Sequence, residues 1–205
     1  NNISQDVYAP EPVIRIISRS LAISTEEIDD VILLKESLDA RKKGKAKKII
    51  SAAVKLKSST IPHGFIAYPS NEINWNGGNR KINERPVIAG CGPAGLFLAY
   101  GLIKKGYRPI IIEQGKRIAN RDGDVAILMS SGNLDVGSNF VFGEGGAGTY
   151  SDGKLTARNV SPITDEVYRT FVKFGADPSI SYQSRPHLGT DNLRRIIPAF
   201  SDYLV

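Results

Sequence analysis

A glycine-rich turn between an apolar segment and a helix-like segment is the part of the sequence with the clearest chemistry. Residues 87–89 are Val-Ile-Ala, and Gly90, Gly92 and Gly95 follow before residues 96–105 take up a helical pattern. Such glycines permit a tight turn, a close backbone approach to a pyrophosphate and close packing of the helix on the strand. The N–H groups and the positive dipole end at the start of a helix favour phosphate groups. The spacing therefore predicts a dinucleotide-binding turn.

The acidic residue that this kind of turn requires is also present. A second apolar segment, residues 109–112, ends at Glu113, about 20 positions after Gly92, where a carboxylate can accept hydrogen bonds from a ribose diol. The same carboxylate would repel a 2′-phosphate, which disfavours NADP as the first ligand. Cys91 lies inside the turn without a second thiol in the chain, so we interpret it as a small filler beside the phosphates rather than a nucleophile.

A second glycine-rich segment, residues 143–155, lies close behind in the chain. Four glycines within six residues exclude a comfortable helix or central strand there. The run suits close backbone approach to a ligand, and the alternative is a mobile surface loop. Because a second ligand-contacting segment would suit a larger cofactor, it favours FAD over NAD, with Gly145, Gly146 and Gly148 at positive φ or against the cofactor.

The elements expected around these turns form an α/β protein with two parts. Residues 84–205 would be the N-terminal, incomplete part of a Rossmann-type FAD/NAD(P)-binding domain, including a helix-like stretch at 191–197. Residues 1–60 would form a small α+β domain, and residues 61–83 a linker that is rich in Pro and Gly.

The pattern of the first 60 residues predicts one helix and two extended segments. Apolar residues from Val13 to Leu21 fall on one helical face, and residues 24–27 form a capping box that no long helix pattern follows. Residues 28–41 and 45–57 are extended, with a turn at 42–44. We also expect the linker aromatics, Phe65, Tyr68 and Trp75, to pack against one part or the other.

The positive charge of the chain is concentrated near the N-terminus. The net charge is +6, and the stretch from Lys35 to Lys57 holds nine basic residues against two acidic ones. Such a patch could contact nucleic acid or an acidic partner. A solvated hairpin with lysines that protect an exposed edge is the favoured interpretation, because no aromatic residues interleave with the lysines.

Composition excludes several other classes. A single cysteine excludes an intrachain disulfide and a dithiol couple, which favours a reducing, cytoplasmic location. Two histidines and one cysteine do not make a structural zinc site, so no metal site is expected. No apolar run reaches the roughly 20 residues that span a bilayer, and the first residues are too polar for a secretory signal. His187 is the one candidate for acid–base chemistry, and a structural hydrogen-bonding role is favoured for it.

Four segments together resemble a known group of proteins. Residues 86–113, 143–155 and 186–193 resemble a bacterial family of uncharacterised FAD-dependent, or NAD(FAD)-utilising, dehydrogenases with the glutathione-reductase-like flavin fold. Residues 37–43 resemble a motif in the N-terminal α+β domain of that family. Because the family's chains continue far beyond this length, the resemblance implies that this chain is a fragment or a truncated product.

The resemblance assigns roles to particular residues. It implies that Glu113 holds the adenosine ribose. The residues implied to line the FAD pyrophosphate are Gly90, Gly92, Pro93, Ala94 and Gly95. Those implied to approach the flavin side are Gly145, Gly146, Ala147 and Gly148. The family commonly has Arg-Gly after the acid, whereas this chain has Gln114-Gly115, which leaves Gln114, Lys116, Arg117 and Arg121 as candidates for contacts to the adenine end.

The resemblance also implies a function. The expected function is that of an FAD-binding oxidoreductase, with NAD(P)H as a candidate electron donor and a substrate that the residues do not identify. The alternative is a flavin- or dinucleotide-binding module whose basic N-terminal domain contacts RNA or an acidic partner without turnover.

Overall fold

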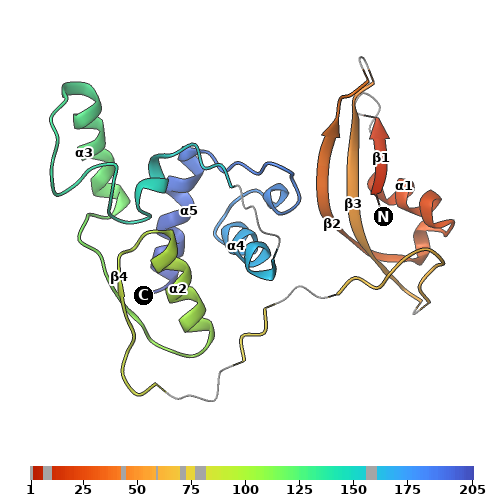
Figure 1. Cartoon of the computed structure of the whole chain (residues 1–205), viewed down its shortest axis with the longest axis horizontal. Helices are drawn as coiled ribbons and strands as arrows, with labels where there is room; N and C mark the ends of the chain where they lie inside the picture. The colour runs from red at the N-terminus through yellow and green to blue at the C-terminus, as the bar shows by residue number, and fades with distance from the viewer. Residues whose placement is uncertain are drawn as a thin grey trace. The chain divides into compact units, whose positions relative to one another are not determined.

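The structure is a computed structural model of the whole chain, in which residues 2–6, 11–42, 45–58, 60–69, 73–76, 82–155 and 161–205 are described. Figure 1 traces the chain from end to end. Its contacts divide it into two compact units, the first formed by Asn1–Asn71 with Ser179–Pro186 and the second by Glu72–Pro178 with His187–Val205. The division falls inside the expected linker, but no sequence pattern places residues 179–186 with the first unit.

The first unit is built on a three-stranded antiparallel sheet. Strands β1 (Asn2–Asp6), β2 (Ile28–Asp39) and β3 (Lys47–Leu56) are arranged in the order β1-β3-β2, so that β3 is central. The two extended segments predicted from the sequence are thus confirmed as an antiparallel pair, whereas β1 was not predicted. Of the predicted turn at 42–44, residues 43 and 44 lie outside the described residues.

Helix α1 (Val13–Leu21) packs through Ile16 and Ile17, which are buried. Ser24 then forms the predicted capping box: its backbone N–H donates to the Glu27 carboxylate at 2.9 Å, and its hydroxyl accepts from the backbone N–H of Glu26 at 3.1 Å. The helix that this box starts is a single 3₁₀ turn, η1 (Thr25–Glu27), because the chain becomes extended at Ile28, where β2 begins.

The lysine-rich hairpin of β2 and β3 is arranged differently from the sequence-based interpretation, in which its lysines protect an exposed sheet edge. Because β3 is the central strand, its lysines do not protect an edge. The outer side of β2 is met by residues 179–186, where the Glu36 N–H donates to the Tyr182 carbonyl at 2.6 Å and the Ser184 N–H donates to the Glu36 carbonyl at 3.0 Å. Part of the positive charge is neutralised locally, for example by the Lys48–Glu36 ion pair at 3.0 Å.

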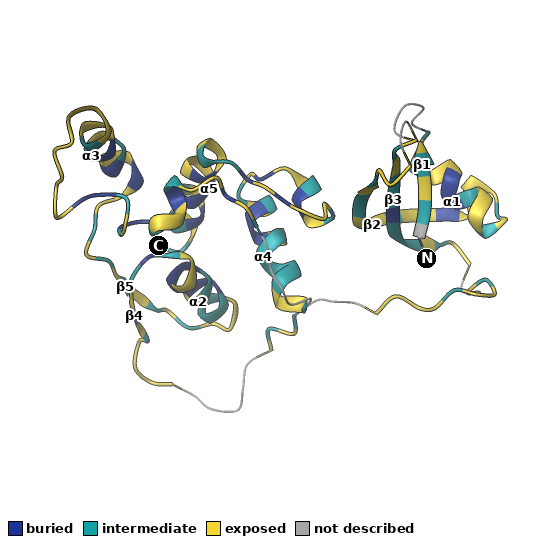
Figure 2. Cartoon of the chain, turned by 45° about the horizontal axis from the view of Figure 1, so that its top comes forward, coloured by how far each residue is buried: buried dark blue, intermediate teal, exposed yellow. Residues whose placement is uncertain are grey.

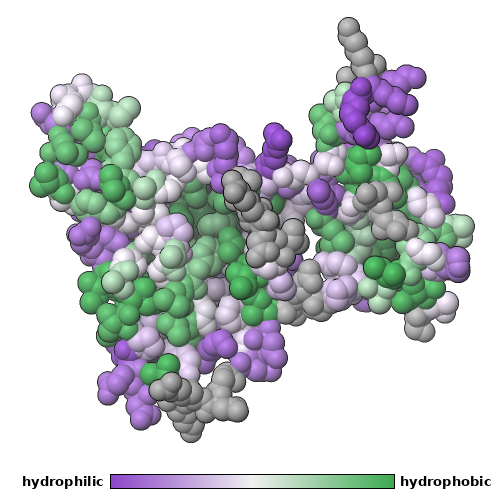
Figure 3. All heavy atoms as spheres, in the orientation of Figure 1, coloured by the Kyte–Doolittle hydropathy of each residue, from purple (hydrophilic) through white to green (hydrophobic). Residues whose placement is uncertain are grey.

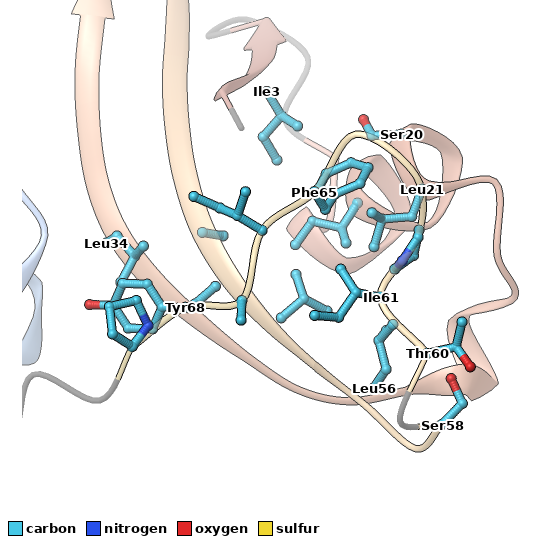
Figure 4. Close-up of a pocket in the computed structure, with 18 residues that line it drawn as sticks. Ile3, Ser20, Leu21, Leu34, Leu56, Ser58, Thr60, Ile61, Phe65 and Tyr68 are labelled. Atoms are coloured by element: carbon cyan, nitrogen blue, oxygen red, sulfur yellow. The ribbon is translucent and has the colours of Figure 1, made fainter.

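The first unit also contains an apolar cavity of about 550 Å³. Figure 4 shows side chains from α1, β2, β3 and the segment 58–69 around this space, among them Leu21, Leu34, Leu56 and Phe65. Part of the expected linker therefore lies against the first unit. The expectation that the linker aromatics pack is confirmed, since Phe65 and Tyr68 line this cavity.

The second unit begins with the strand–turn–helix–strand pattern that the sequence predicts. Strands β4 (Val87–Ala89) and β5 (Ile110–Ile112) pair in parallel, and helix α2 (Pro93–Lys104) connects them. Trp75 packs edge-on against Tyr100 of α2 with ring centroids 6.3 Å apart. In the described part of the chain this parallel sheet has two strands, so the fold shown is a mixed α/β arrangement with one βαβ unit.

Three further helices, α3 (Ile118–Ser131), α4 (Pro162–Lys173) and α5 (Thr190–Tyr203), follow the βαβ unit, with short 3₁₀ turns η2 (Ala147–Tyr150) and η3 (Pro178–Ser181). The predicted helical stretch at 191–197 is thus longer than expected and continues past Pro198. Aromatic side chains join α2, α4 and α5: the half-buried Phe97 lies 5.5 Å from the buried Phe171 and 5.2 Å from the buried Phe200 between ring centroids. Figure 2 marks the buried positions of α2, α4 and α5 in dark blue.

One face of the parallel strand pair is bare. Ile88 points under α2 and is 5% exposed, whereas Val87 and Ile112 on the opposite face are 62% and 60% exposed. Figure 3 shows hydrophobic surface in this region and over α3. Among the described residues, no helix combines the length and apolar character that crossing a bilayer requires.

Candidate dinucleotide-binding site

The turn between β4 and α2 has the geometry that its glycines predict. Gly90 has φ +94° and its N–H donates to the Ile112 carbonyl at 2.7 Å. A Cβ on Gly95 would lie 2.0 Å from the Gly90 carbonyl oxygen, so only glycine fits there. Gly92 is the N-cap of α2 and Pro93 occupies its first turn, where proline is well tolerated.

The start of α2 presents backbone donors without acceptors. In the part of the chain that the structure describes, the N–H groups of Gly92, Ala94 and Gly95 have no hydrogen-bond acceptor. The first N–H groups of a helix have no intrahelical partner and carry the positive end of the helix dipole. This turn therefore has the donors that an anionic group requires.

The second glycine-rich segment lies directly against this turn. The Gly145 N–H donates to the Cys91 carbonyl at 2.8 Å, and a Cβ built on Gly92 would lie 3.9 Å from the Gly146 Cα. Gly145 and Gly146 have φ +75° and +65°. Gly148 does not have a positive φ and has open space around it, so its conformation does not require glycine. The structure thus brings the two glycine-rich segments together.

Glu113 connects the turn to the end of β5. Its carboxylate accepts hydrogen bonds from the Cys91 N–H at 2.6 Å and the Gly115 N–H at 2.8 Å. These two bonds hold the carboxylate at the carboxyl end of the strand pair. A carboxylate has about four acceptor positions, so two remain for a ligand.

The basic candidates for the adenine end are already engaged. Lys116 pairs with Asp124 at 2.8 Å and with Asp135 at 3.3 Å, and Arg117 pairs with Asp202 at 2.8 Å. These side chains are solvent-exposed, so such pairs are weak and exchangeable. Gln114 is exposed beside them.

Arg121 occupies a different position from the one that the sequence suggests. It is fully buried, and its guanidinium donates to four carbonyl groups, those of Asn139, Phe140, Glu144 and Gly146. In this structure it therefore supports the second glycine-rich segment from within and has no exposed donor for a ligand. Burial lowers the pKa of Arg121 from its ordinary value, and nearby Tyr150 and carboxylates oppose that shift.

Two residues of this region were not identified from the sequence. Glu144 is 4% exposed, and its carboxylate accepts from the Ile118 N–H at 2.8 Å while its other oxygen, Oε1, is buried without a partner. Tyr150 stacks on Arg121, 4.9 Å from the guanidinium to the ring centroid, and its hydroxyl donates to Asp122 at 2.9 Å. Burial, and then the hydrogen bond to Asp122, raises the pKa of Tyr150 to about 12. A capping or stacking partner that is distant in sequence leaves no local pattern, so no signal in the sequence could have found them.

His187 meets the end of the second glycine-rich segment through its backbone and not through its side chain. Its side chain is exposed, and its backbone pairs with that of Lys154 in an isolated bridge. The described residues contain no group of three or more His, Cys, Asp or Glu side chains placed to hold a metal ion.

The fold and site define a class: a mixed α/β protein in which a βαβ turn and a second glycine-rich loop meet. No protein-family model matches the sequence. The chain is 38% identical over 188 residues to a protein of Clostridium beijerinckii whose description is "Uncharacterized protein". That match covers 88% of this chain and 35% of the relative, so the chain spans about a third of the relative's length.

Proposed function

We propose that this chain carries the FAD-binding turn of an oxidoreductase. The observation that carries the proposal is the contact between the two glycine-rich segments at Gly92 and Gly146, beside backbone N–H groups that have no acceptor among the described residues. A diphosphate needs donors from the backbone and the absence of side chains that would fill its space.

The residues present fit such a group. Gly92, Ala94 and Gly95 would supply N–H groups to the pyrophosphate, and Glu113 would hold a ribose hydroxyl with the acceptor positions that its two backbone bonds leave open. Gly146 and Ala147 would lie toward the flavin side. The second segment is the reason to prefer FAD to NAD, because it adds a contact surface beyond the βαβ turn.

The function of the longer protein belongs to the same proposal. When bound, the isoalloxazine ring of FAD supplies the redox chemistry, and this chain's residues bind and orient it. NAD(P)H is the candidate electron donor. The bare face of β4 and β5 supports a larger Rossmann-type domain, because parallel strands are ordinarily covered on both faces.

The proposal is tested with two glycine variants that differ only in position. Gly92→Ala adds a methyl group between the two loops, where the nearest atom to it, the Gly146 Cα, lies at an ordinary contact distance of 3.9 Å. We expect it to weaken FAD binding at least tenfold, about 1.4 kcal/mol, while the melting temperature of the empty protein stays unchanged. The dissociation constant is measured by quenching of flavin fluorescence.

Gly123→Ala is the matched control, because Gly123 lies on α3, outside both glycine-rich segments, and has nothing within 4 Å of a built Cβ. It should bind FAD as the wild type does. Equal affinity in the wild type and Gly92→Ala would contradict the proposed site, and a wild-type protein that binds neither FAD nor NAD would contradict the proposed function.

A further inference from the structure

The most unusual interior group of the second unit is Arg121 on α3. Its side chain is 0% exposed, and it makes no ion pair with any carboxylate among the described residues. Removing a cation from water costs free energy unless hydrogen bonds replace its hydration. Here backbone carbonyls replace it, and all four of them belong to residues 139–146.

Two of these carbonyls lie in the glycine-rich segment itself. The Glu144 carbonyl accepts from Arg121 Nη1 at 2.7 Å, and the Gly146 carbonyl accepts from both Nη1 and Nη2 at 3.3 Å. A trans peptide is planar, so its C=O and the N–H of the next residue point in opposite directions. Each carbonyl that faces the guanidinium therefore turns the following N–H group away from it.

The first of these peptide groups explains how the two loops are joined. The Glu144 carbonyl points to Arg121, and the Gly145 N–H on the other side of the same peptide donates to the Cys91 carbonyl at 2.8 Å. Arg121 thus fixes the peptide that links the second glycine-rich segment to the turn after β4.

The second peptide group leaves a donor available. The Gly146 carbonyl points to Arg121, so the Ala147 N–H is directed away from the guanidinium, and no described residue accepts a hydrogen bond from it. Ala147 is exposed and follows Gly146, which contacts Gly92. The donor is thus held at the edge of the proposed cofactor site.

The start of α3 holds the same segment at further points. The Glu144 N–H donates to the Lys116 carbonyl at 3.1 Å, and the Glu144 carboxylate accepts from the Ile118 N–H at 2.8 Å. A Cβ on Gly143 would lie 2.6 Å from Arg121 Cδ, so the stem of the arginine passes directly along the glycine backbone.

We propose that Arg121 is a positioning residue of the cofactor site: it orients the 144–145 and 146–147 peptides so that one joins the two loops and the other offers the Ala147 N–H to the ligand. This inference rests on the proposed function and adds which donor the second segment supplies. The planar guanidinium with five donors can hold these carbonyls together, whereas an ammonium group offers three donors at one point.

The experiment uses two variants, one that changes the guanidinium that orients the peptides and one that removes the N–H group offered to the ligand. Arg121→Lys keeps the charge but loses the planar set of donors. Ala147→Pro removes the N–H group and adds a ring at an exposed position; proline is tolerated at the first position of a helical turn, and the ψ of −161° at Gly146 lies outside the α region that a following proline disfavours. Arg195→Lys is the matched control, because Arg195 also donates to a carbonyl, that of Gly175, but is exposed on α5.

Two measurements, amide exchange at Gly145 and FAD affinity, separate the positioning of the loop from direct contact with the ligand. In Arg121→Lys, we expect the backbone amide of Gly145 to exchange with deuterium at least tenfold faster, measured without ligand by mass spectrometry of the 139–150 region. FAD affinity should fall about tenfold in both Arg121→Lys and Ala147→Pro. Ala147→Pro should leave the Gly145 exchange rate unchanged, and Arg195→Lys should alter neither quantity.

Wild-type FAD affinity in both variants would overturn the inference while leaving the proposed function intact. A wild-type protein that binds no FAD overturns both, so the two failures are distinguishable. If Arg121→Lys does not fold, Ala147→Pro decides by itself: unchanged affinity overturns the assignment of the Ala147 donor, and a tenfold loss supports it.

Discussion

Cys91 shows how much a single residue of the β4–α2 turn connects. Its N–H donates to Glu113 at 2.6 Å, and its carbonyl accepts from Gly145 at 2.8 Å, so its main chain joins the end of β5 to the second glycine-rich segment. Its side chain is 7% exposed. The sequence-based interpretation of a small filler agrees with this burial.

The environment of Cys91 predicts slow chemistry at its thiol. Burial, and then the negative charge of Glu144, raises the pKa of the Cys91 thiol above its ordinary value. The thiolate is the nucleophile, and a raised pKa lowers the thiolate fraction at every pH below it. At pH 8 we therefore expect iodoacetamide to alkylate folded protein at least about tenfold more slowly than protein unfolded in urea, as measured by mass spectrometry.

The pH dependence supplies the control for Cys91. The alkylation rate of the folded protein should still be rising above about pH 10, where that of the unfolded protein levels off because an ordinary thiol is then almost fully ionised. Equal rates for the folded and unfolded protein at pH 8 would show that the thiol is accessible and its pKa ordinary.

At the scale of elements, two helices each contain a glycine, and only one of the two positions requires glycine. Gly95 in α2 has no room for a methyl group, because a Cβ would lie 2.0 Å from the Gly90 carbonyl oxygen. Gly123 in α3 is helical, exposed and has nothing within 4 Å of a built Cβ. The same residue type therefore serves helix–strand packing in α2 and costs stability in α3.

Gly123→Ala should stabilise the protein. An alanine in an exposed helix interior is more favourable than glycine by roughly 0.5–1 kcal/mol, which raises the melting temperature by about 1–4 °C in a chain of this size. Gly95→Ala should lower it, because the clash is with backbone that cannot move without opening the turn. A lowered melting temperature for Gly123→Ala, measured by circular dichroism, would mean that α3 does not have this exposed face.

At the scale of the whole molecule, the second unit presents apolar surface that its own helices do not cover. The parallel register pairs Val87 with Ile110 and Ala89 with Ile112, so these four side chains share one face. The opposite face carries Ile88 and is covered by α2. Contiguous exposed apolar patches are typical of surfaces that contact a partner or a further part of the same protein.

This face should bind a hydrophobic dye. The double variant Val87→Thr and Ile110→Thr keeps β-branched residues in both strands but adds hydroxyl groups to the exposed face. We expect it to lower the fluorescence of 1-anilinonaphthalene-8-sulfonate bound to the protein without lowering the melting temperature. Ile163→Thr, at an exposed position of α4, should leave the fluorescence unchanged; an equal signal from the double variant and the wild type would show that this face is covered.

Local pattern was sufficient for the βαβ unit, for α1 and the β2–β3 pair, and for the first part of the candidate site, but not for β1, α3 or α4. Three glycines, a helix and an acid at fixed spacing predicted the β4–α2–β5 unit because each residue acts through its own backbone or that of its close neighbours. Two extended segments with a turn between them predicted the β2–β3 pair in the same way. These features depend on interactions within about 30 residues, which a sequence displays directly.

Only the tertiary structure decided the roles of Arg121 and Glu144 and the joining of the two loops. Arg121 was a surface candidate for a ligand on the basis of charge, but packing of α3 against residues 139–146 buries it and directs it to carbonyl groups. Carbonyl groups are the same in every residue, so the sequence carries no sign of which of them a side chain will meet. The placement of residues 179–186 on β2 was invisible for the same reason, since it uses backbone hydrogen bonds between segments far apart in the chain.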